Sequence, residues 1–496
     1  MSMPRFVLAC AAFAFVPLPA EAQQLLRAHA DGYGSGAASL ADLDGDAVPD
    51  YAIQRFDPDS ERDVVELRSG ASGALIRSIP SGEPSKFDSW LFGWALADAG
   101  DVDGDGVHDV LIGAPQSPDP TGAIIGAGGA FVYSGRDGAL LWSAYGAKKD
   151  QRFGGAVAGL DDVDGDGHAD FLVASPTNAG RMTPFITAFS GASGASLYVV
   201  QDALAPTRIS DRDRDGIREF VEVLTDVHVR SGATGAVLAT LSSAVGFSGG
   251  LAELDDLDGD GERELAVGEF GAVNRLDGQV RVVSIPTGAT VRTHLAVEAN
   301  ELLGQHIDAG LDADGDGVRD YLASAASPFG PPGSASLFSG RTGERLYRFI
   351  DLDADFSMGN TVTGLGDLDG DGFDECMIGS PEDTPPGTGQ LGADLLFRGG
   401  RLWFDAYPKS VAAGEVETAA IHGAPYGKPI AIFIVGVDGA PRFQLLGMAV
   451  SGCNESFFAS AVVPDGLTGS RWIFRAYALD EYCKLMTSAD EVIEFR

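Results

Sequence analysis

The stretch DVDGDGVHD, at residues 101–109, is the feature that most constrains how this chain can fold. Carboxylates stand at its first, third, fifth and ninth positions, and glycines stand at its fourth and sixth. The alternating aspartates supply the hard oxygen ligands that Ca²⁺ prefers, and the glycines permit tight backbone turns. The carbonyl of Val107 and the carboxylate of Asp109 can add further oxygens. The spacing therefore predicts a calcium-binding loop.

The same nine-residue pattern occurs seven times along the chain. The copies begin at Asp42, Asp101, Asp162, Asp211, Asp256, Asp312 and Asp367, which lie 59, 61, 49, 45, 56 and 55 residues apart. A pattern repeated at this period predicts an array of similar supersecondary units. Solvated acidic turns are the plainest alternative, but seven independent turns would not share one spacing.

An EF-hand agrees less well with the sequence, because that motif needs flanking helices and a bidentate glutamate at the twelfth position of its loop. Apolar residues occupy this position in four copies, namely Ile112, Val173, Val267 and Ala323. The fourth copy has Glu222 there, within a run (FVEVL) that predicts a strand.

The net charge of −38 arises from 72 acidic and 34 basic residues, and the first, third, fifth and ninth positions of the seven loops account for 28 of the acids. Seven bound Ca²⁺ ions would reduce the formal charge to −24, since each ion adds two positive charges. Nucleic acid is excluded as a partner, because the chain has no basic stripe to displace counterions from phosphates.

Apolar runs around each loop predict four strands per repeat. In the second copy these runs cover 92–99, 110–115, 129–135 and 139–146, and Arg136-Asp137-Gly138 provides a tight turn between the last two. Repeats of four antiparallel strands are typical of propeller blades, and propellers usually have ~4–8 blades. The expected fold is therefore all-β, with a seven-bladed β-propeller of four-stranded antiparallel blades.

The residues on either side of the second loop carry a resemblance to a known family. Phe92-Gly93 before the loop and Gly113-Ala114-Pro115 after it resemble the FG-GAP repeat of integrin alpha-subunit propellers and their bacterial secreted relatives. Close variants are Phe153-Gly154 with Ala174-Ser175-Pro176, and Met358-Gly359 with Gly379-Ser380-Pro381. The resemblance covers residues 24–403 and implies Ca²⁺ in the hairpin between the first and second strands of a blade.

Carried over by position, the resemblance implies up to seven Ca²⁺ ions. The implied carboxylate ligands are Asp42, Asp44, Asp46 and Asp50; Asp101, Asp103, Asp105 and Asp109; Asp162, Asp164, Asp166 and Asp170; Asp211, Asp213, Asp215 and Glu219; Asp256, Asp258, Asp260 and Glu264; Asp312, Asp314, Asp316 and Asp320; and Asp367, Asp369, Asp371 and Glu375. The implied backbone donors at the seventh position are Val107, His168, Glu262, Val318 and Phe373. The side chains of His108 and His168 are expected at the surface.

Two copies depart from the pattern. The first has Ala47 where glycine is expected and Pro49 at its eighth position, which we expect to strain the loop. The fourth has three arginines among its acids and closes with Glu219, so we expect it to bind Ca²⁺ poorly or to be held by salt bridges. Glu264 and Glu375 also replace aspartate, and their longer side chains can still reach an ion.

The propeller is expected to span 23–405, and 406–496 is expected to form a small β-sandwich. The runs that predict strands in this C-terminal module are 429–437, 442–450 and 471–479. Either Gln24–Ala28 or Arg401–Asp405 could supply the strand that closes the ring.

The N-terminus has the features of a secretory signal peptide over 1–22. Arg5 provides the positive charge, an apolar run follows at 6–16, and Ala20-Glu21-Ala22 is an A-x-A cleavage site. A lipoprotein signal at Cys10 is the weaker alternative. No later segment has the ~20 apolar residues of a spanning helix. Secretion is expected, to the extracellular space or to the periplasm or surface of a bacterium.

Export would permit disulfides among the cysteines that remain after cleavage. Cys453 and Cys483 are the natural pair, and Cys376 lies in an apolar strand pattern typical of a buried free thiol.

No catalytic motif is evident, and the seven histidines have no metal-ligand spacing. The favoured interpretation is a secreted, non-enzymatic binding or adhesion protein whose calcium-fixed propeller presents loops to an extracellular protein or glycan. The alternative is a calcium-dependent carbohydrate-active enzyme, such as a polysaccharide lyase, with a site in the central channel. A cluster of His, Arg, Lys or Tyr on one propeller face would favour that alternative. A purely structural role in a cell envelope also stays open.

Overall fold

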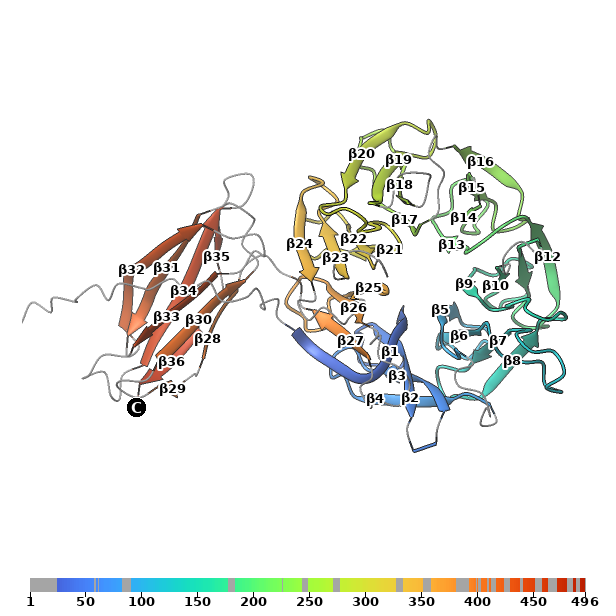
Figure 1. Cartoon of the computed structure of the whole chain (residues 1–496), viewed down its shortest axis with the longest axis horizontal. Helices are drawn as coiled ribbons and strands as arrows, with labels where there is room; N and C mark the ends of the chain where they lie inside the picture. The colour runs from blue at the N-terminus through green and yellow to red at the C-terminus, as the bar shows by residue number, and fades with distance from the viewer. Residues whose placement is uncertain are drawn as a thin grey trace, which may run out of the picture. The chain divides into compact units, whose positions relative to one another are not determined.

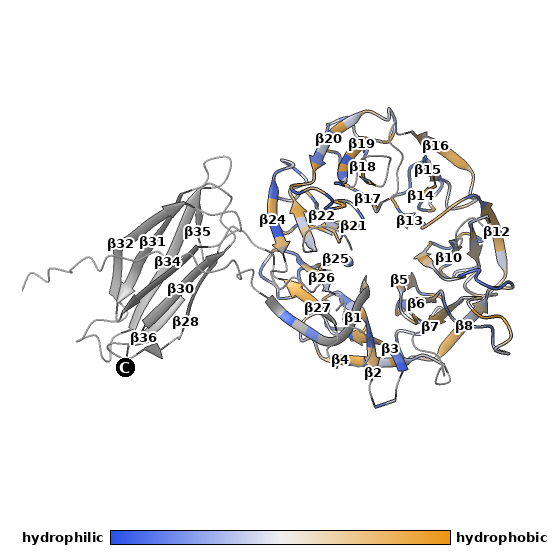
Figure 2. Ribbon diagram, viewed as in Figure 1, coloured by the Kyte–Doolittle hydropathy of each residue, from blue (hydrophilic) through white to orange (hydrophobic). Residues whose placement is uncertain are grey.

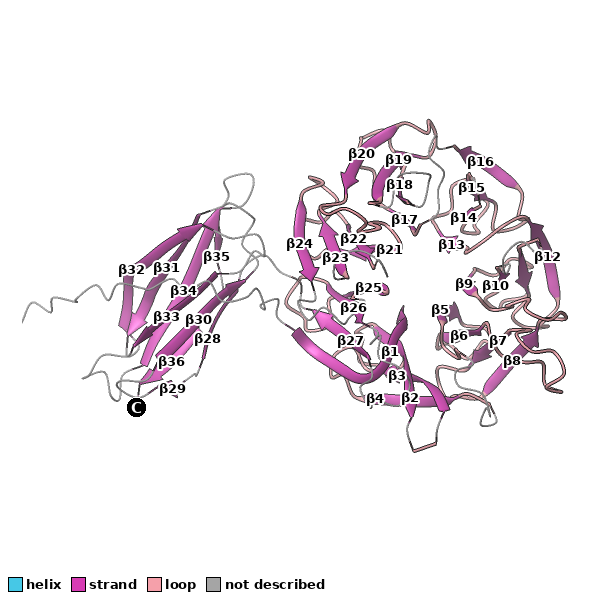
Figure 3. Cartoon of the chain, in the orientation of Figure 1, coloured by secondary structure: helices cyan, strands magenta, loops and turns pink. Residues whose placement is uncertain are grey.

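The chain folds into two compact units, of which one is Leu25–Gly399 and the other contains Gly400–Arg496. The computed structural model describes residues 25–57, 59–60, 62–82, 91–176, 183–224, 226–242, 249–270, 277–326, 333–350, 358–380, 392–397 and 399, and the backbone of the strands between 403 and 495. These residues form strands and turns, with no helix among them (Figure 3), and so none that could cross a membrane. The predicted signal peptide lies outside them.

The first unit is a seven-bladed propeller of four-stranded antiparallel blades, as predicted (Figure 1). Blades 1 to 4 consist of β1 (Leu25–Leu40), β2 (Asp50–Asp57), β3 (Arg62–Arg68) and β4 (Leu75–Pro80); β5 (Ala95–Gly100), β6 (Asp109–Ala114), β7 (Gly129–Tyr133) and β8 (Leu140–Tyr145); β9 (Ala156–Gly159), β10 (Phe171–Ser175), β11 (Phe185–Phe189) and β12 (Ser196–Gln201); and β13 (Thr207–Arg208), β14 (Phe220–Val223), β15 (Val227–Arg230) and β16 (Val237–Leu241). Blades 5 to 7 consist of β17 (Leu251–Glu253), β18 (Glu264–Glu269), β19 (Gln279–Ser284) and β20 (Thr290–Leu295); β21 (Ile307–Leu311), β22 (Asp320–Ala325), β23 (Ser334–Phe338) and β24 (Arg345–Ile350); and β25 (Thr361–Gly366), β26 (Glu375–Ser380) and β27 (Gly392–Phe397). The first strand of each blade faces the centre of the ring, and the fourth lies at its rim (Figure 1).

The long strand β1 closes the ring. Its first half pairs with β27 as the fourth strand of blade 7, and its second half pairs with β2 as the first strand of blade 1. The expectation that Gln24–Ala28 completes the last blade is thus confirmed from Leu25 onward. Arg27 adds a side-chain link, because its guanidinium donates to the carbonyls of Gly70 at 2.7 Å and Ala71 at 2.8 Å in blade 1.

Apolar side chains hold neighbouring blades together. The cluster between blades 2 and 3 joins Val132 and Leu111 to Phe171 and Val173, all of them fully buried. The other blade junctions contain equivalent clusters, and apolar residues recur on the strands around the ring (Figure 2). The core is therefore a series of interfaces between blades, and each blade is stabilised by burial against its two neighbours.

The glycines of the FG-GAP-like pattern lie where adjacent blades approach most closely. A Cβ atom on Gly113 of blade 2 would lie 2.1 Å from the carbonyl oxygen of Gly154 in blade 3. Gly154 has a φ of +80°, a conformation that glycine adopts without strain. Its N–H donates to the carbonyl of Ala174 at 3.0 Å. Larger residues at these positions would push the blades apart.

The C-terminal unit contains two sheets, in agreement with the predicted small β-sandwich. One sheet has the order β28-β30-β33, and the other has the order β29-β36-β34-β31-β32 with β35 paired to β34. The strands are β28 (Trp403–Tyr407), β29 (Ser410–Val411), β30 (Val416–His422), β31 (Pro429–Val437), β32 (Ala440–Val450), β33 (Phe457–Val462), β34 (Arg471–Leu479), β35 (Leu485–Thr487) and β36 (Glu491–Phe495).

The second option for ring closure, Arg401–Asp405, is wrong, because β28 pairs with β30 inside the C-terminal unit. The boundary placed at Asp405 from the sequence falls within this strand. Cys376 is buried and unbridged, as predicted, and burial raises the pKa of its thiol above the ordinary range. The predicted Cys453–Cys483 pair lies outside the described residues.

Candidate metal centres

The seven repeated loops occupy one equivalent place in each blade, the hairpin between its first and second strands; we call them acidic loops 1 to 7 after their blades. In acidic loop 2, between β5 and β6, Gly104 and Gly106 have φ values of +76° and +86°. Two loops place other residues in this left-handed region, Ala47 with φ +69° in loop 1 and Arg214 with φ +64° in loop 4. The strain expected at Ala47 is therefore present, and Arg214 shares it.

The first aspartate of every acidic loop organises the backbone around itself. In loop 2, one oxygen of Asp101 accepts the N–H groups of Gly104 at 2.7 Å and Asp105 at 3.0 Å, and the other accepts Gly106 at 2.9 Å. The equivalents Asp42, Asp162, Asp211, Asp256, Asp312 and Asp367 accept in the same way. Carboxylate oxygens have further lone pairs, so these bonds leave capacity for an ion.

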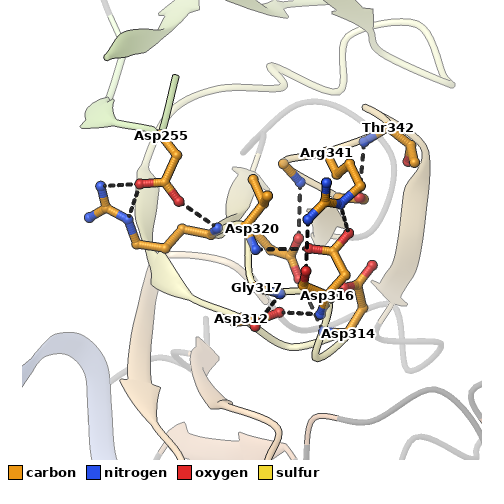
Figure 4. A network of polar contacts seen from close by, with 12 residues as sticks. Asp255, Asp312, Asp314, Asp316, Gly317, Asp320, Arg341 and Thr342 are labelled. Atoms are coloured by element: carbon orange, nitrogen blue, oxygen red, sulfur yellow. Dashed lines mark hydrogen bonds and ion pairs between the residues drawn. The ribbon is translucent and has the colours of Figure 1, made fainter. Parts of the chain in front are cut away.

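The predicted carboxylate ligands converge within their loops. In loops 4 and 5, all four acids offer oxygens within 4.8 Å of one another: Asp211, Asp213, Asp215 and Glu219 in one, and Asp256, Asp258, Asp260 and Glu264 in the other. In loops 1, 2 and 3 the first, third and ninth acids do so: Asp42, Asp44 and Asp50; Asp101, Asp103 and Asp109; and Asp162, Asp164 and Asp170. Figure 4 shows the corresponding acids of loop 6 gathered around one turn. Groups of hard oxygen donors like these suit Ca²⁺ better than softer metals.

The ninth acid of a loop also has a structural role that the sequence did not reveal. Asp109 is 1% exposed. One of its oxygens accepts the N–H of Val102 at 2.7 Å, and the other accepts the N–H of Gly135 at 3.1 Å, in the hairpin between β7 and β8. The carboxylate thus ties the acidic loop to the neighbouring hairpin of its blade. Asp50, Asp170, Asp320 and Glu375 each make an equivalent pair of bonds.

Loops 4 and 5 lack the second of these bonds. Glu219 accepts the N–H of Arg212 at 2.6 Å through one oxygen, and Glu264 accepts that of Leu257 at 2.5 Å. The other oxygen of each glutamate is buried and has no hydrogen-bond partner among the described residues.

Burial raises the pKa of the ninth-position acids, and the charges of neighbouring aspartates add to the effect. The pKa rises to about 6 for Asp109 and Glu264, to about 8 for Glu375 and to about 9 for Asp320. These groups therefore hold protons at a pH where exposed carboxyls are ionised. A bound cation would favour the ionised form instead.

Arginines contact some of the fifth-position acids, a feature absent from the sequence-based ligand set. Arg136, in the hairpin between β7 and β8, places Nε 2.7 Å from an Asp105 oxygen. Arg341 places Nε 2.9 Å from Asp316 in loop 6 (Figure 4). These arginines can be found in the sequence from the turn between the third and fourth strands, which reads SGRDG or SGRTG in blades 2 and 6 and SGASG or SGATG in blades 1, 3 and 4.

The arginines of loop 4 bond outside their own loop. Arg212 lies 3.0 Å from Glu262 of loop 5, and Arg218 lies 2.6 Å from Asp161 beside loop 3. Arg319 of loop 6 similarly lies 2.8 Å from Asp255 (Figure 4). Loop 4 was expected to bind Ca²⁺ poorly or to be held by salt bridges; Arg212 and Arg218 do form salt bridges, and these join loop 4 to its neighbours.

Other contacts between loops involve the backbone and the two histidines. The N–H of Ala169 in loop 3 donates to the carbonyl of Asp101 in loop 2 at 2.9 Å. His108 is exposed, as predicted, and bonds Asp98 at 2.9 Å. His168 is half-buried instead, because its ring lies 2.9 Å from the carbonyl oxygen of Val102.

Residues in or beside the first strands of blades 1, 2, 4, 5, 6 and 7 line an open central cavity of about 730 Å³. Most of its wall is small or apolar. His306 and Asp308 are the titratable groups among the described residues that line it, and none of those residues is Arg, Lys or Tyr. Asp308 accepts the N–H groups of Gly364 and Ala309, both at 2.8 Å, and burial raises its pKa to about 6.

Comparisons with known proteins agree with this architecture. Residues 92–139 match the model of the FG-GAP repeat. Integrin alpha-4 of Xenopus laevis is 30% identical over 155 residues, which cover 28% of this chain and 14% of the integrin. Integrin alpha-PS2 of Drosophila melanogaster is 34% identical over 156 residues, covering 29% and 11%. Integrin alpha pat-2 of Caenorhabditis briggsae is 25% identical over 252 residues, covering 48% and 18%.

This chain spans less than a fifth of the length of each of these integrins. The similarity therefore concerns a shared part of the proteins. The repeat match falls on blade 2, from the Phe92-Gly93 pair through the acidic loop to the turn before β8. Together with the seven blades and their acidic hairpins, these matches identify the unit Leu25–Gly399 as an integrin alpha-like FG-GAP β-propeller.

Proposed function

We propose that this chain is a secreted, calcium-binding and non-enzymatic binding or adhesion protein. The observation that carries the proposal is the repetition of one carboxylate cluster in the blades of an integrin alpha-like propeller. The first, third, fifth and ninth acids of each loop would hold an ion, with the seventh carbonyl as a further donor. Bound Ca²⁺ would neutralise the clustered charge and fix the loops.

The role of calcium here is structural. Net charge of −38 concentrates in loops that also touch one another, so their mutual repulsion weakens the calcium-free ring. Ion binding would stabilise the folded state by mass action, because the unfolded chain has no preformed site. A rigid propeller could then present its loops to an extracellular protein or glycan.

The alternative, a carbohydrate-active enzyme, has less support. A lyase in the central channel would need groups that abstract and return protons, held at fixed positions beside a substrate. The described wall of the cavity offers His306 and Asp308, and both oxygens of Asp308 accept backbone N–H groups. We therefore propose binding rather than catalysis. The comparison proteins, as integrin alpha subunits, point to the same class.

Calcium dependence of stability and of binding tests the proposal. The full chain is freed of metal with a chelator and titrated with Ca²⁺ from micromolar to ~10⁻³ M, the range of extracellular modules. We expect a large rise in melting temperature and several ions per chain by metal analysis. The calcium-loaded chain is then applied to arrays of extracellular matrix proteins and glycans, with chelator-treated chain as the control. Absence of bound calcium, or turnover of an acidic polysaccharide by the purified chain, would contradict the proposal.

A further inference from the structure

Acidic loops 4 and 5 differ from the others in how their ninth residue is bonded. Glu219 and Glu264 are each 0% exposed, yet one oxygen of each has no hydrogen-bond partner among the residues described. Both glutamates belong to clusters in which all four acids offer oxygens within 4.8 Å of one another. Each unpartnered carboxylate thus belongs to a complete group of calcium-type donors.

The remaining loops satisfy their ninth acid from within the protein. Asp109 and Asp320 use both oxygens on backbone N–H groups, one of them in the hairpin between the third and fourth strands. Glu375 does so as well, with Gly399 at 3.3 Å, so a glutamate alone does not create the unpartnered oxygen. In loops 2 and 6 an arginine also contacts the fifth acid.

We propose that acidic loops 4 and 5 are the two tightest calcium sites of the chain and fill before the other five. This inference rests on the proposed calcium binding and assigns an order to it. A buried carboxylate oxygen without a hydrogen-bond partner is unfavourable, because burial removes its contact with bulk water and no N–H replaces it. An ion bound there restores the missing interaction, whereas in the other loops the same oxygen already accepts an N–H.

The proposed order of calcium filling is the opposite of the expectation from the sequence that loop 4 binds Ca²⁺ poorly because of its arginines. Arg212 and Arg218 are directed to Glu262 and Asp161, which lie outside loop 4. The four acids of the loop are therefore left to the ion. Arginines in loop 4 instead link it to its two neighbours.

Calcium titration of the full chain, by calorimetry and by equilibrium dialysis, tests the order. We expect the wild-type chain to bind two ions in its tightest class. Glu219→Gln and Glu264→Gln should each remove one ion from that class, weakening it at least tenfold, and the double variant should remove both. Glu375→Gln is the matched control, since it removes a glutamate whose two oxygens are both bonded; it should leave the class of two unchanged.

A second pair of variants guards against misfolding. Glu219→Asp and Glu264→Asp introduce the side chain that loops 1, 2 and 3 contain at this position. We expect each of these variants to reduce the number of ions in the tightest class as well. The proposed filling order would be wrong if the double variants still bound two ions in the tightest class, or if Glu375→Gln reduced that number equally. Calcium bound at seven indistinguishable sites would overturn it too while leaving the proposed function intact. A chain that binds no calcium would instead contradict the proposed function.

Discussion

Acidic loops 2 and 5 share one nine-residue pattern but are held in place by different means. In loop 2, Asp109 bonds two backbone N–H groups and Arg136 contacts Asp105. In loop 5, Glu264 bonds one N–H group, and no ion pair holds Asp260 among the described residues. The acids of loop 2 are therefore largely hydrogen-bonded by the protein itself, whereas loop 5 leaves a buried oxygen of Glu264 without a hydrogen-bond partner among the described residues.

The difference teaches that a repeated motif can serve two purposes within one ring. Loops such as 2 and 3 stabilise their blades through hydrogen bonds that exist without an ion. Loops such as 4 and 5 lack part of that support, so with the proposed calcium binding their contribution to stability would depend on the ion. The calcium response of the whole propeller would then arise mainly from one arc, blades 4 and 5.

The largest effect expected from this comparison concerns the calcium-free chain. Asp109→Asn should lower the free energy of unfolding by about 1–3 kcal/mol, because an amide NH₂ would face one of the N–H donors that the carboxylate now accepts. Glu264→Gln should be neutral or stabilising, since its NH₂ can donate to the neighbouring aspartates. Urea unfolding of both variants in chelator measures the two values.

Calcium saturation should alter this result in a defined way. With the ion bound, Glu264→Gln becomes the more damaging change relative to wild type, because it removes a charged ligand from the site. Equal destabilisation of the two variants without calcium would show that the loops are held alike, and the comparison would then fail.

A smaller effect is expected from pH, again in the calcium-free chain. The pKa is about 8 for Glu375 and about 9 for Asp320, raised by burial and by nearby aspartates. These two acids thus bind more protons in the folded chain than in the unfolded chain above pH ~4, so their contribution to the free energy of unfolding falls as pH rises. His29 and His294, with the pKa lowered to about 4 by burial, act only below pH 6.5.

In the window from pH 6.5 to 9 these two histidines no longer contribute, and His108, whose pKa is raised by its hydrogen bond to Asp98, acts in the same direction as the acids. Thermal unfolding followed by circular dichroism should give a melting temperature that decreases across this window without calcium. Saturating calcium should remove the decrease, because the ion holds the same carboxyls ionised. A melting temperature that rises across the window in chelator would show that these acids are ionised in the folded chain.

The sequence predicted the fold because its signals are local and repeated. The blades repeat the loop spacing, the apolar runs and hairpin turns such as Arg136-Asp137-Gly138. Each pattern is weak evidence by itself, but the seven copies together indicate one architecture. Which strand closes the ring was left open, since β1 pairs with residues more than 350 positions away in the sequence. Alternating runs at 24–28 and 401–405 look alike, and only tertiary pairing separates them.

The candidate sites were predicted to the level of residue type and no further. The spacing predicted Asp101 and its equivalents as candidate ligands, but the bonds that distinguish loop 2 from loop 5 come from the hairpin between the third and fourth strands. Gly135 and Arg136 lie 26 and 27 residues after the acid at 109, outside any loop motif. The partners of Arg212 and Arg218 in loop 4 could not be predicted for the same reason, because Glu262 and Asp161 belong to other blades.

The smallest effect expected concerns Arg136 itself. Arg136→Gln should raise the calcium affinity of acidic loop 2 by a few-fold, because the guanidinium that contacts Asp105 competes with the ion for its charge. The calcium-free stability should change by less than about 1 kcal/mol, since the arginine side chain is more than half exposed and such pairs contribute little. Arg341→Gln should act likewise on loop 6, and Arg77→Gln, whose guanidinium bonds the carbonyl of Gly135 rather than an acid, is the control. An affinity unchanged by Arg136→Gln in calorimetric titration would mean that the arginine and the ion occupy Asp105 together, and loop 2 would then differ from loop 5 only through its ninth residue.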